Sequence, residues 1–213
     1  MSLYTKVGDQ GSTRFPDGRL GRKSEPVVAA LGSLDELNSH VGLCLCEARA
    51  RGFVEIVDAL TPLQPQIMTL SATLVQTPSR GAGVSPALCV PCGLSAEDEQ
   101  PFPSSGNAGE TPAPREGKPF TVPLDPAAIG EMENLIDEIT AALGPLKRLL
   151  VPGGSELACR LHVARTVCRR AERDLVAVND HQRLLEPPTL PFINRLSDLL
   201  FNLARLANHQ TGC

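Results

Sequence analysis

The sequence predicts an all-α fold in which four or five helices pack as a bundle. Several long segments carry apolar residues at alternating spacings of four and three, which places them along one face of a helix. No segment shows a comparable alternation typical of β-strands. Apolar residues make up 42% of the 213 residues but aromatic residues only 3%, so leucine, alanine and valine are expected to fill the core.

The first two predicted helices cover residues 26–49 and 53–76. Pro62 and Pro65 are expected to break or kink the second one, because proline lacks the amide N–H that a helix interior needs. The first helix shows a bundle seam with one polar member, made of Val27, Leu31, Leu34, Asn38, Val41 and Leu45.

The remaining predicted helices cover residues 126–143, 155–178 and 191–208. Asp125 and Ser155 stand at the start of two of them and are candidate N-caps, since their side chains can accept hydrogen bonds from the first free N–H groups. The apolar seam of the last helix consists of Ile193, Leu196, Leu200, Leu203 and Ala207. The most regular seam belongs to residues 155–178 and consists of Leu157, Leu161, Ala164, Cys168, Ala171, Leu175 and Val178.

Residues 77–123 differ in composition from the rest of the chain, because proline, glycine and serine dominate and no apolar periodicity survives. A connection of this length is expected to be a functional lid or a disordered insertion, and its composition favours disorder. Residues 1–213 are therefore predicted to form a single domain that contains this insertion between its second and third helices.

Charge and composition limit the possible partners. A net charge of −4 argues against a general nucleic-acid binder. No apolar run reaches the roughly 18 residues of a membrane span, and no signal-peptide pattern opens the sequence, so we expect a soluble protein, with a removed presequence left open. The seven cysteines indicate a reducing compartment. The Cys89/Cys92 pair lacks a second ligand pair for zinc, and four cysteines are expected to be small buried side chains: Cys44, Cys46, Cys159 and Cys168.

The opening stretch YTKVGDQGSTR, residues 4–14, suits neither a regular helix nor a regular strand. Its glycines would let backbone N–H groups approach a ligand, and its lysine suits a phosphate. It lacks the spacing of a P-loop. A phosphate-binding loop and an ordinary surface turn both remain open at this point.

A polar stripe follows one face of the 155–178 helix and consists of Arg165, Arg169, Glu172 and Arg173. Three arginines within just over two turns repel one another unless an anion lies against them, although a solvated charged face is the alternative. Arg170 is adjacent, and Asn194, Asp198 and Asp35 lie beside the seams of other predicted helices. Together these side chains predict a polyphosphate site.

Five motifs, in this order, resemble those of the PduO-type ATP:cob(I)alamin adenosyltransferases: YTKVGDQGSTR, SLDELNSHVGL, VPGG, LHVARTVCRRAER and FINRLSDLLFNLAR. The resemblance runs from Tyr4 to about Ala207, interrupted by the insertion. It implies a homotrimer of five-helix bundles with the up-and-down arrangement of ferritin-like folds, with ATP and cobalamin bound between subunits. It also implies transfer of the 5′-deoxyadenosyl group of ATP to cob(I)alamin, forming adenosylcobalamin and triphosphate, with Mg²⁺ accompanying ATP.

The resemblance further implies roles for individual residues. Asp35 and Arg165 match an ion pair that shapes the active site between subunits. Lys6, Lys23 and Arg169 are expected to stabilise charge on the leaving triphosphate. The position of Leu149 is a phenylalanine in many relatives, where it displaces the lower axial ligand of cobalamin; leucine is smaller and lacks a flat face. The positions that match nucleotide contacts are Thr5, Lys6, Val7, Gly8, Thr13, Arg14, Lys23, Arg169, Arg170, Ala171, Glu172, Arg173 and Asn194.

Alternative functions remain at this stage. A non-catalytic nucleotide- or cobalamin-binding adaptor could use the same arginine stripe, and a chaperone role toward a cobalamin-dependent mutase, together with a reductase partner, is compatible with enzymatic activity. A di-metal bundle would need Glu-x-x-His pairs, which the sequence lacks. We expect a cytoplasmic protein in a bacterium, or a mitochondrial matrix protein in a eukaryote after removal of a presequence. His162 and His181 have no required role, and each is expected to be a packed or surface residue.

Overall fold

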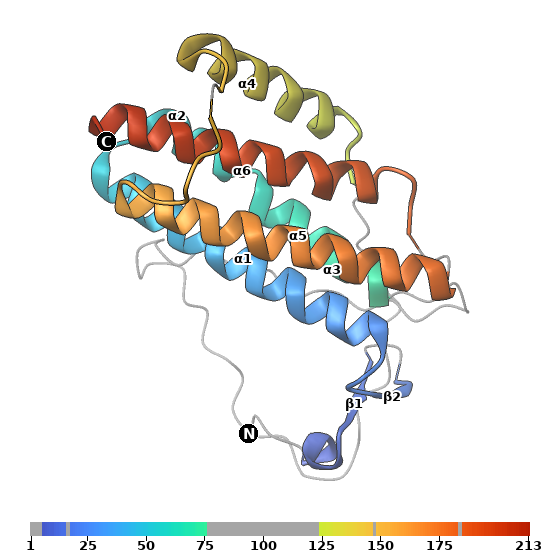
Figure 1. Cartoon of the computed structure of the whole chain (residues 1–213). Helices are drawn as coiled ribbons and strands as arrows, with labels where there is room; N and C mark the ends of the chain where they lie inside the picture. Colours follow the sequence, from blue (N-terminus) through green and yellow to red (C-terminus); the bar gives the residue numbers. More distant parts are fainter. Residues whose placement is uncertain (1–5, 16–17, 76–123, 147, 183–184) are drawn as a thin grey trace, which may run out of the picture. The chain divides into compact units, whose positions relative to one another are not determined.

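The computed structural model describes residues 6–15, 18–75, 124–146, 148–182 and 185–213, and within them six α-helices carry the fold (Figure 1). Their bounds are α1 Pro26–Arg51, α2 Val54–Leu60, α3 Leu63–Val75, α4 Ala127–Leu143, α5 Glu156–Gln182 and α6 Thr189–Thr211. The all-α prediction is confirmed. The second predicted helix is split into α2 and α3 at Thr61 and Pro62, as its prolines suggested. The whole predicted insertion, residues 77–123, lies outside the described residues.

The helices pack as a bundle around leucine-rich seams. Helix α1 lies beside α5, α5 beside α6, α4 against α6, and α3 against α1 (Figure 1). The predicted α5 seam is confirmed, because all seven of its side chains, from Leu157 to Val178, are 0% exposed. Burial of each leucine contributes about 2 kcal/mol relative to an exposed one, so this seam fixes which face of α5 remains available for a ligand.

Both predicted helix caps are present. The Asp125 carboxylate accepts a hydrogen bond from the Ala127 N–H at 2.9 Å at the start of α4. The Ser155 hydroxyl accepts one from the Ala158 N–H at 3.3 Å in the first turn of α5. Each cap satisfies one of the amide groups that the first turn of a helix leaves without a partner.

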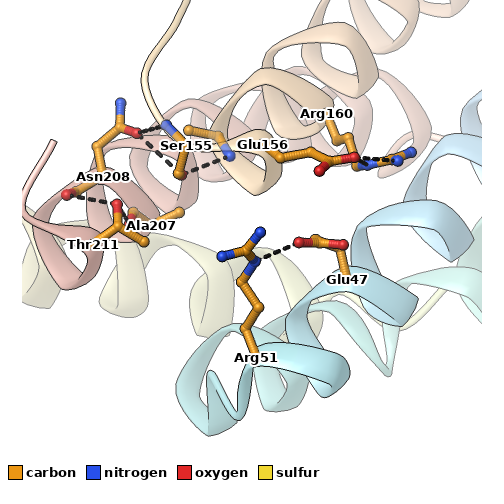
Figure 2. A network of polar contacts seen from close by, with 9 residues as sticks. Glu47, Arg51, Ser155, Glu156, Arg160, Ala207, Asn208 and Thr211 are labelled. Atoms are coloured by element: carbon orange, nitrogen blue, oxygen red, sulfur yellow. Dashed lines mark hydrogen bonds and ion pairs between the residues drawn. The ribbon is translucent and has the colours of Figure 1, made fainter.

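Asn208 of α6 fastens the turn that leads into α5. Its Oδ1 accepts hydrogen bonds from the Ser155 N–H at 2.8 Å and from the Ser155 hydroxyl at 3.2 Å (Figure 2). Its Nδ2 donates to the Gly153 carbonyl at 2.9 Å. Gly154 has a φ of 98°, and a Cβ there would come within 2.2 Å of Asn208 Oδ1, so only glycine fits this close approach.

The N-terminal stretch has regular structure, so the expectation that it forms neither helix nor strand is wrong. Val7–Gln10 forms a 3-10 helix, η1, and strand β1, Ser12–Arg14, pairs antiparallel with strand β2, Leu20–Arg22. Strands of three residues are too short to show a periodic pattern. Phe15, directly after β1, is buried as part of the hydrophobic core, and a Cβ on Gly21 would lie 2.4 Å from its ring.

The cysteine prediction is half right. Cys44 and Cys168 are buried as expected, and burial raises the pKa of the Cys44 thiol to about 12, which keeps it neutral. Cys46 and Cys159 are exposed, because each follows a fully buried residue (Cys44 and Leu157) by two positions and is turned about 200° from it around the helix. The Cys89/Cys92 pair lies outside the described residues. Among the helices that the structure describes, none has the length and apolarity required to cross a membrane.

Candidate functional site

The predicted stripe lies on α5, and we call it, together with the adjacent Arg170, the arginine face: Arg165, Arg169, Arg170, Glu172 and Arg173. Arg169 and Arg173 are exposed, whereas the other three are half-buried at the edge of the bundle core. The Arg173 guanidinium donates from Nη1 to the carbonyl of Arg169 at 3.0 Å. Ala171, which the resemblance places among the nucleotide contacts, has its side chain fully buried in the core.

Helix α6 adds a hydrogen-bond donor to this face. Asn194 Nδ2 donates to Glu172 Oε1 at 2.9 Å, which ties α6 to α5 and holds the carboxylate beside the arginines. Asp198, which was expected beside the stripe, instead forms an ion pair with Arg195, with 2.9 Å between Arg195 Nη1 and Asp198 Oδ2. Arg195 also reaches Glu133 of α4 at 3.0 Å. The amide of Asn194 therefore joins the candidate site, while the Asp198 carboxylate takes part in a separate network.

Helix α1 holds the other side of the arginine face. Arg170 forms an ion pair with Glu36, and the Ser33 hydroxyl donates to the Asp174 carboxylate. The sequence-based prediction missed Glu36, although its position directly after Asp35 in a helix expected to border the site could have drawn attention to it. These links between α1 and α5 restrict the rotation of the arginine-bearing helix.

Asp35 and Arg165 do not meet within one chain. No hydrogen bond or ion pair joins them in the part of the chain that the structure describes, and the Asp35 residue is exposed. Arg165 Nε is buried and has no hydrogen-bond partner among the described residues, while its guanidinium lies 5.9 Å from the ring centroid of Phe201. Arg165 therefore keeps donor capacity that no described residue of its own chain uses.

His162 lies one turn before Arg165 and contacts the same aromatic ring. It is 6% exposed, and its ring centroid is 6.0 Å from that of Phe201. Burial, and secondarily the charge of Arg165, lower the pKa of this imidazole. The expectation of a packed or surface histidine holds for both residues, since His162 is packed and His181 is exposed.

The N-terminal loop brings three predicted residues together. Lys6 has a left-handed backbone with φ 60°, a conformation that is uncommon outside glycine and often occurs at binding sites. A Cβ on Gly8 would lie 3.1 Å from Lys23 Nζ, so the Lys23 ammonium lies directly against the backbone of η1. Neither the Lys6 nor the Lys23 ammonium bonds to α5 or α6 within the described residues.

The other predicted residues of this loop are less informative. Arg14 donates from Nη1 to the Gly18 carbonyl at 3.1 Å, which stabilises the hairpin turn. Thr13 is a half-buried residue of β1, and Val7 is the first residue of η1. Thr5 lies outside the described residues.

An exposed apolar segment precedes α5, and we call it the apolar loop: Leu146, Leu149, Leu150 and Val151. Leu149 is 101% exposed and Val151 is 89% exposed. Exposed apolar groups gathered in this way are typical of a surface that binds an apolar ligand or partner. Helix α6 holds both ends of the segment, since Arg205 Nη2 donates to the Gly144 carbonyl at 2.7 Å and Asn208 holds Gly153.

Comparisons with known proteins agree on one family. The family model for cobalamin adenosyltransferase matches residues 3–88 and 105–207, so 89–104, within the predicted insertion, is the stretch it leaves unmatched between them. The Bacillus subtilis corrinoid adenosyltransferase is 32% identical over 213 residues, covering 100% of this chain and 89% of that protein. The human corrinoid adenosyltransferase MMAB is 30% identical over 210 residues, covering 99% and 70%.

The Citrobacter freundii corrinoid adenosyltransferase PduO is 32% identical over 209 residues, covering 98% of this chain and 50% of that protein, so the chain spans about half its length. Among solved structures, a variant PduO-type ATP:corrinoid adenosyltransferase from Lactobacillus reuteri, complexed with cobalamin and ATP, is 31% identical with a TM-score of 0.73, and the match covers 99% of this chain and 96% of that one. Another variant, complexed with ATP, is 30% identical with a TM-score of 0.70 and the same coverage. The chain therefore belongs to the cobalamin adenosyltransferase family, in its PduO-type branch.

Proposed function

We propose that this protein transfers the 5′-deoxyadenosyl group of ATP to cob(I)alamin, forming adenosylcobalamin and triphosphate. The arginine face carries the proposal: it gathers four cations and an oriented carboxylate at the edge of the core, which suits a polyphosphate. Relatives with this activity in their names match the chain over nearly its whole length. The apolar loop offers a surface for the second, largely apolar reactant.

The proposed reaction requires the protein only to orient the two reactants and to stabilise the charge on the leaving triphosphate. The electron pair of Co(I) forms the bond to the 5′ carbon, the carbon–oxygen bond breaks, and its electron pair leaves with triphosphate. No proton needs to move, so no general base is required. Arg169, Lys6 and Lys23 would stabilise the leaving charge, and the Glu172–Asn194 pair would help orient the nucleoside.

Mg²⁺ is the expected companion of the triphosphate. In the described residues, no group of three histidine, cysteine or acidic side chains could hold a metal ion. Mg²⁺ commonly keeps waters and binds substrate phosphates with only one or two carboxylates. In this proposal it would therefore be held mainly by the triphosphate itself.

We further propose that the active site lies between subunits of a homotrimer. Among the described residues, the lysines of the N-terminal loop make no bond to α5 or α6, and neither Arg165 Nε nor the Asp35 carboxylate has a hydrogen-bond or ion-pair partner. A neighbouring copy could supply the missing half, with Asp35 of one chain pairing with Arg165 of another. Sedimentation equilibrium would test this, and a monomer that retains full activity would contradict it.

Leu149 of the apolar loop is proposed to cover the lower face of cobalamin. A water-free, apolar surface there would favour the four-coordinate Co(II) state that is reduced to Co(I). The full exposure of Leu149 supports this role, because the side chain is free to contact a ligand.

The decisive experiment mixes the protein with ATP and chemically reduced cobalamin and follows the absorbance of the adenosylated product. Conversion that requires both ATP and protein is expected. Binding of both reactants without conversion would instead favour the second candidate function, a non-catalytic adaptor. The leucine at position 149 supports this second candidate.

The domain organisation and cellular setting also remain proposals. We propose a single domain in which residues 77–123 are an insertion. Replacing residues 79–118 by a short Gly/Ser linker should therefore leave the melting temperature unchanged, and a large drop would contradict this.

Transfer of the product to a cobalamin-dependent mutase, with a reductase supplying Co(I), is the proposed context. The proposed compartment is the bacterial cytoplasm or the mitochondrial matrix, and localisation of the tagged full-length protein would test it.

A further inference from the structure

A groove lies between α2–α3 and α4, away from the arginine face, and has a volume of about 350 Å³. Apolar side chains line it, including Leu63 of α3, Met132 and Leu135 of α4, and Leu199 of α6. Gln66 also lines it, and its Oε1 is buried without a hydrogen-bond donor in the described part of the chain. The groove thus combines an apolar lining with an unused acceptor.

The groove is also negatively charged at its edge. Glu55 and Asp58 of α2 and Glu131 of α4 are exposed lining residues. Glu55 accepts a hydrogen bond from Gln210 at 3.0 Å, while neither Asp58 nor Glu131 takes part in an ion pair among the described residues. Helices α2, α3 and α4 contain no lysine, arginine or histidine at all, so nothing on these three helices neutralises the edge.

We propose that this groove binds a cationic amphipathic helix of another protein. The lining residues Ala128, Met132 and Leu135 are spaced by four and three along α4, a strip of two turns. A partner helix that lays an apolar face into a groove uses the same spacing for its anchors. Lysine or arginine on the flanks of that helix would meet Asp58 and Glu131, since complementary charge favours encounter and register.

Charge also argues against the chain itself as the occupant. Residues 77–123 carry five acidic side chains against three basic ones: Glu97, Asp98, Glu99, Glu110 and Glu116 against Arg80, Arg115 and Lys118. A second copy of the chain has a net charge of −4. A negatively charged edge repels the segment 77–123. The arginines of a second copy gather on its α5, at the site proposed for ATP, so a separate cationic partner fits the groove better.

The probe is a designed peptide with leucine on one face of a helix and lysine on the other, labelled for fluorescence anisotropy with the full chain. The test variant is the double substitution Asp58→Lys with Glu131→Lys. The matched control is Asp137→Lys with Glu138→Lys, which makes the same charge change at exposed positions of α4 that do not line the groove. We expect the test variant to weaken peptide binding at least tenfold and the control less than twofold, with adenosylation unchanged in both.

Two further peptides separate the apolar lining from general electrostatics. A scrambled peptide of the same composition, without an apolar face, and a counterpart with glutamate in place of lysine should both bind at least tenfold more weakly. Equal weakening by the two double variants, or equal binding of the scrambled peptide, would overturn the proposal. Absence of binding by the Leu/Lys peptide would do the same.

The competing occupants have their own signatures. If the chain with residues 79–118 replaced by a linker bound the peptide at least tenfold more tightly, the groove would belong to the chain's own segment. If the double substitution Asp58→Lys with Glu131→Lys changed the mass of the assembly measured by sedimentation equilibrium, the groove would be an interface between copies of the chain. Either result would overturn the assignment to a foreign helix, whereas unchanged mass and unchanged affinity in the linker variant support it.

Discussion

The arginine face and the groove are opposite in charge, although both border the same leucine-rich core. Helix α5 carries five arginines, while α2, α3 and α4 carry none. Their buried seams are nevertheless of the same kind, with apolar residues at spacings of four and three. The comparison teaches that the seams specify the fold and that the polar residues beside them specify what each surface can bind.

The two regions also differ in how firmly their charges are held. On the arginine face, Arg170 pairs with Glu36 and Glu172 accepts from Asn194, so neighbouring helices orient the polar groups. At the groove, Asp58 and Glu131 lack such links among the described residues. Fixed groups suit a small ligand that must be oriented for reaction, while unrestrained carboxylates suit a docking partner that brings its own counter-charges.

Substitution of Arg169 tests the contrast between the two surfaces most directly. Arg169→Ala should lower turnover at saturating ATP by at least about tenfold, equivalent to about 1.4 kcal/mol, because it removes a cation from the leaving triphosphate. The control is Arg160→Ala on the same helix, whose side chain pairs with Glu156 at 2.6 Å outside the arginine face (Figure 2). Equal turnover in the two variants would remove Arg169 from the catalytic residues.

The next test concerns the coupling of Asp35 and Arg165 across subunits. Asp35→Asn and Arg165→Gln should each lower activity several-fold, and the double variant should lose less than the product of the two single losses. The physical reason is that a single substitution leaves one charged group without its partner. Activity assays of the four proteins in a double-mutant cycle provide the measurement, and strictly multiplicative losses would show that the two side chains do not interact.

A smaller effect is expected at Leu149 of the apolar loop, which we proposed to cover the lower face of cobalamin. Leu149→Phe should raise the bound fraction of four-coordinate Co(II) cobalamin and increase turnover, with little change in the KM for ATP, because a ring covers more of the lower face. Visible absorption or paramagnetic resonance with ATP present measures the fraction. If Leu150 or Val151 already fills this space, the larger ring overpacks the site, and the four-coordinate fraction does not rise.

The smallest effect is expected at His162, whose pKa is lowered by burial and secondarily by the charge of Arg165. The folded-state pKa lies below the unfolded value of about 6.5, so the unfolded chain binds the proton first and stability falls as the pH drops below about 6.5. His162→Gln should flatten this part of the dependence of the melting temperature on pH. His181→Gln, at an exposed position, is the control and should leave it unchanged.

Much of the bundle could be predicted from the sequence because helical periodicity is local. The seams, the caps at Asp125 and Ser155 and the break at Pro62 all depend on residues within one or two turns of each other. The β-hairpin was missed because its strands have three residues each and its pairing depends on the fit of Phe15 against Gly21.

The candidate site was predictable only in part, for the same reason. The arginine face lies on one helix, so its spacing shows it directly. The ion pair from Arg170 to Glu36 and the clamp by Asn208 join residues that are far apart in the chain, and no local pattern indicates them. The groove also escaped prediction, because it exists only where α2 and α3 approach α4 over Leu199.

Because α6 holds both ends of the apolar loop, the residues between these ends can be exchanged as a unit. Arg205 and Asn208 are three residues apart on α6, hence neighbours on one helical face, and they hold Gly144 and Gly153 at the two ends of the loop. Because closing a longer loop costs only about 0.6 kcal/mol for each doubling of its length, residues between these anchors can be replaced or added without displacing α4 or α5. The surface proposed to contact a corrinoid can thus diversify, by evolution or by design, independently of the helix that carries the arginine face.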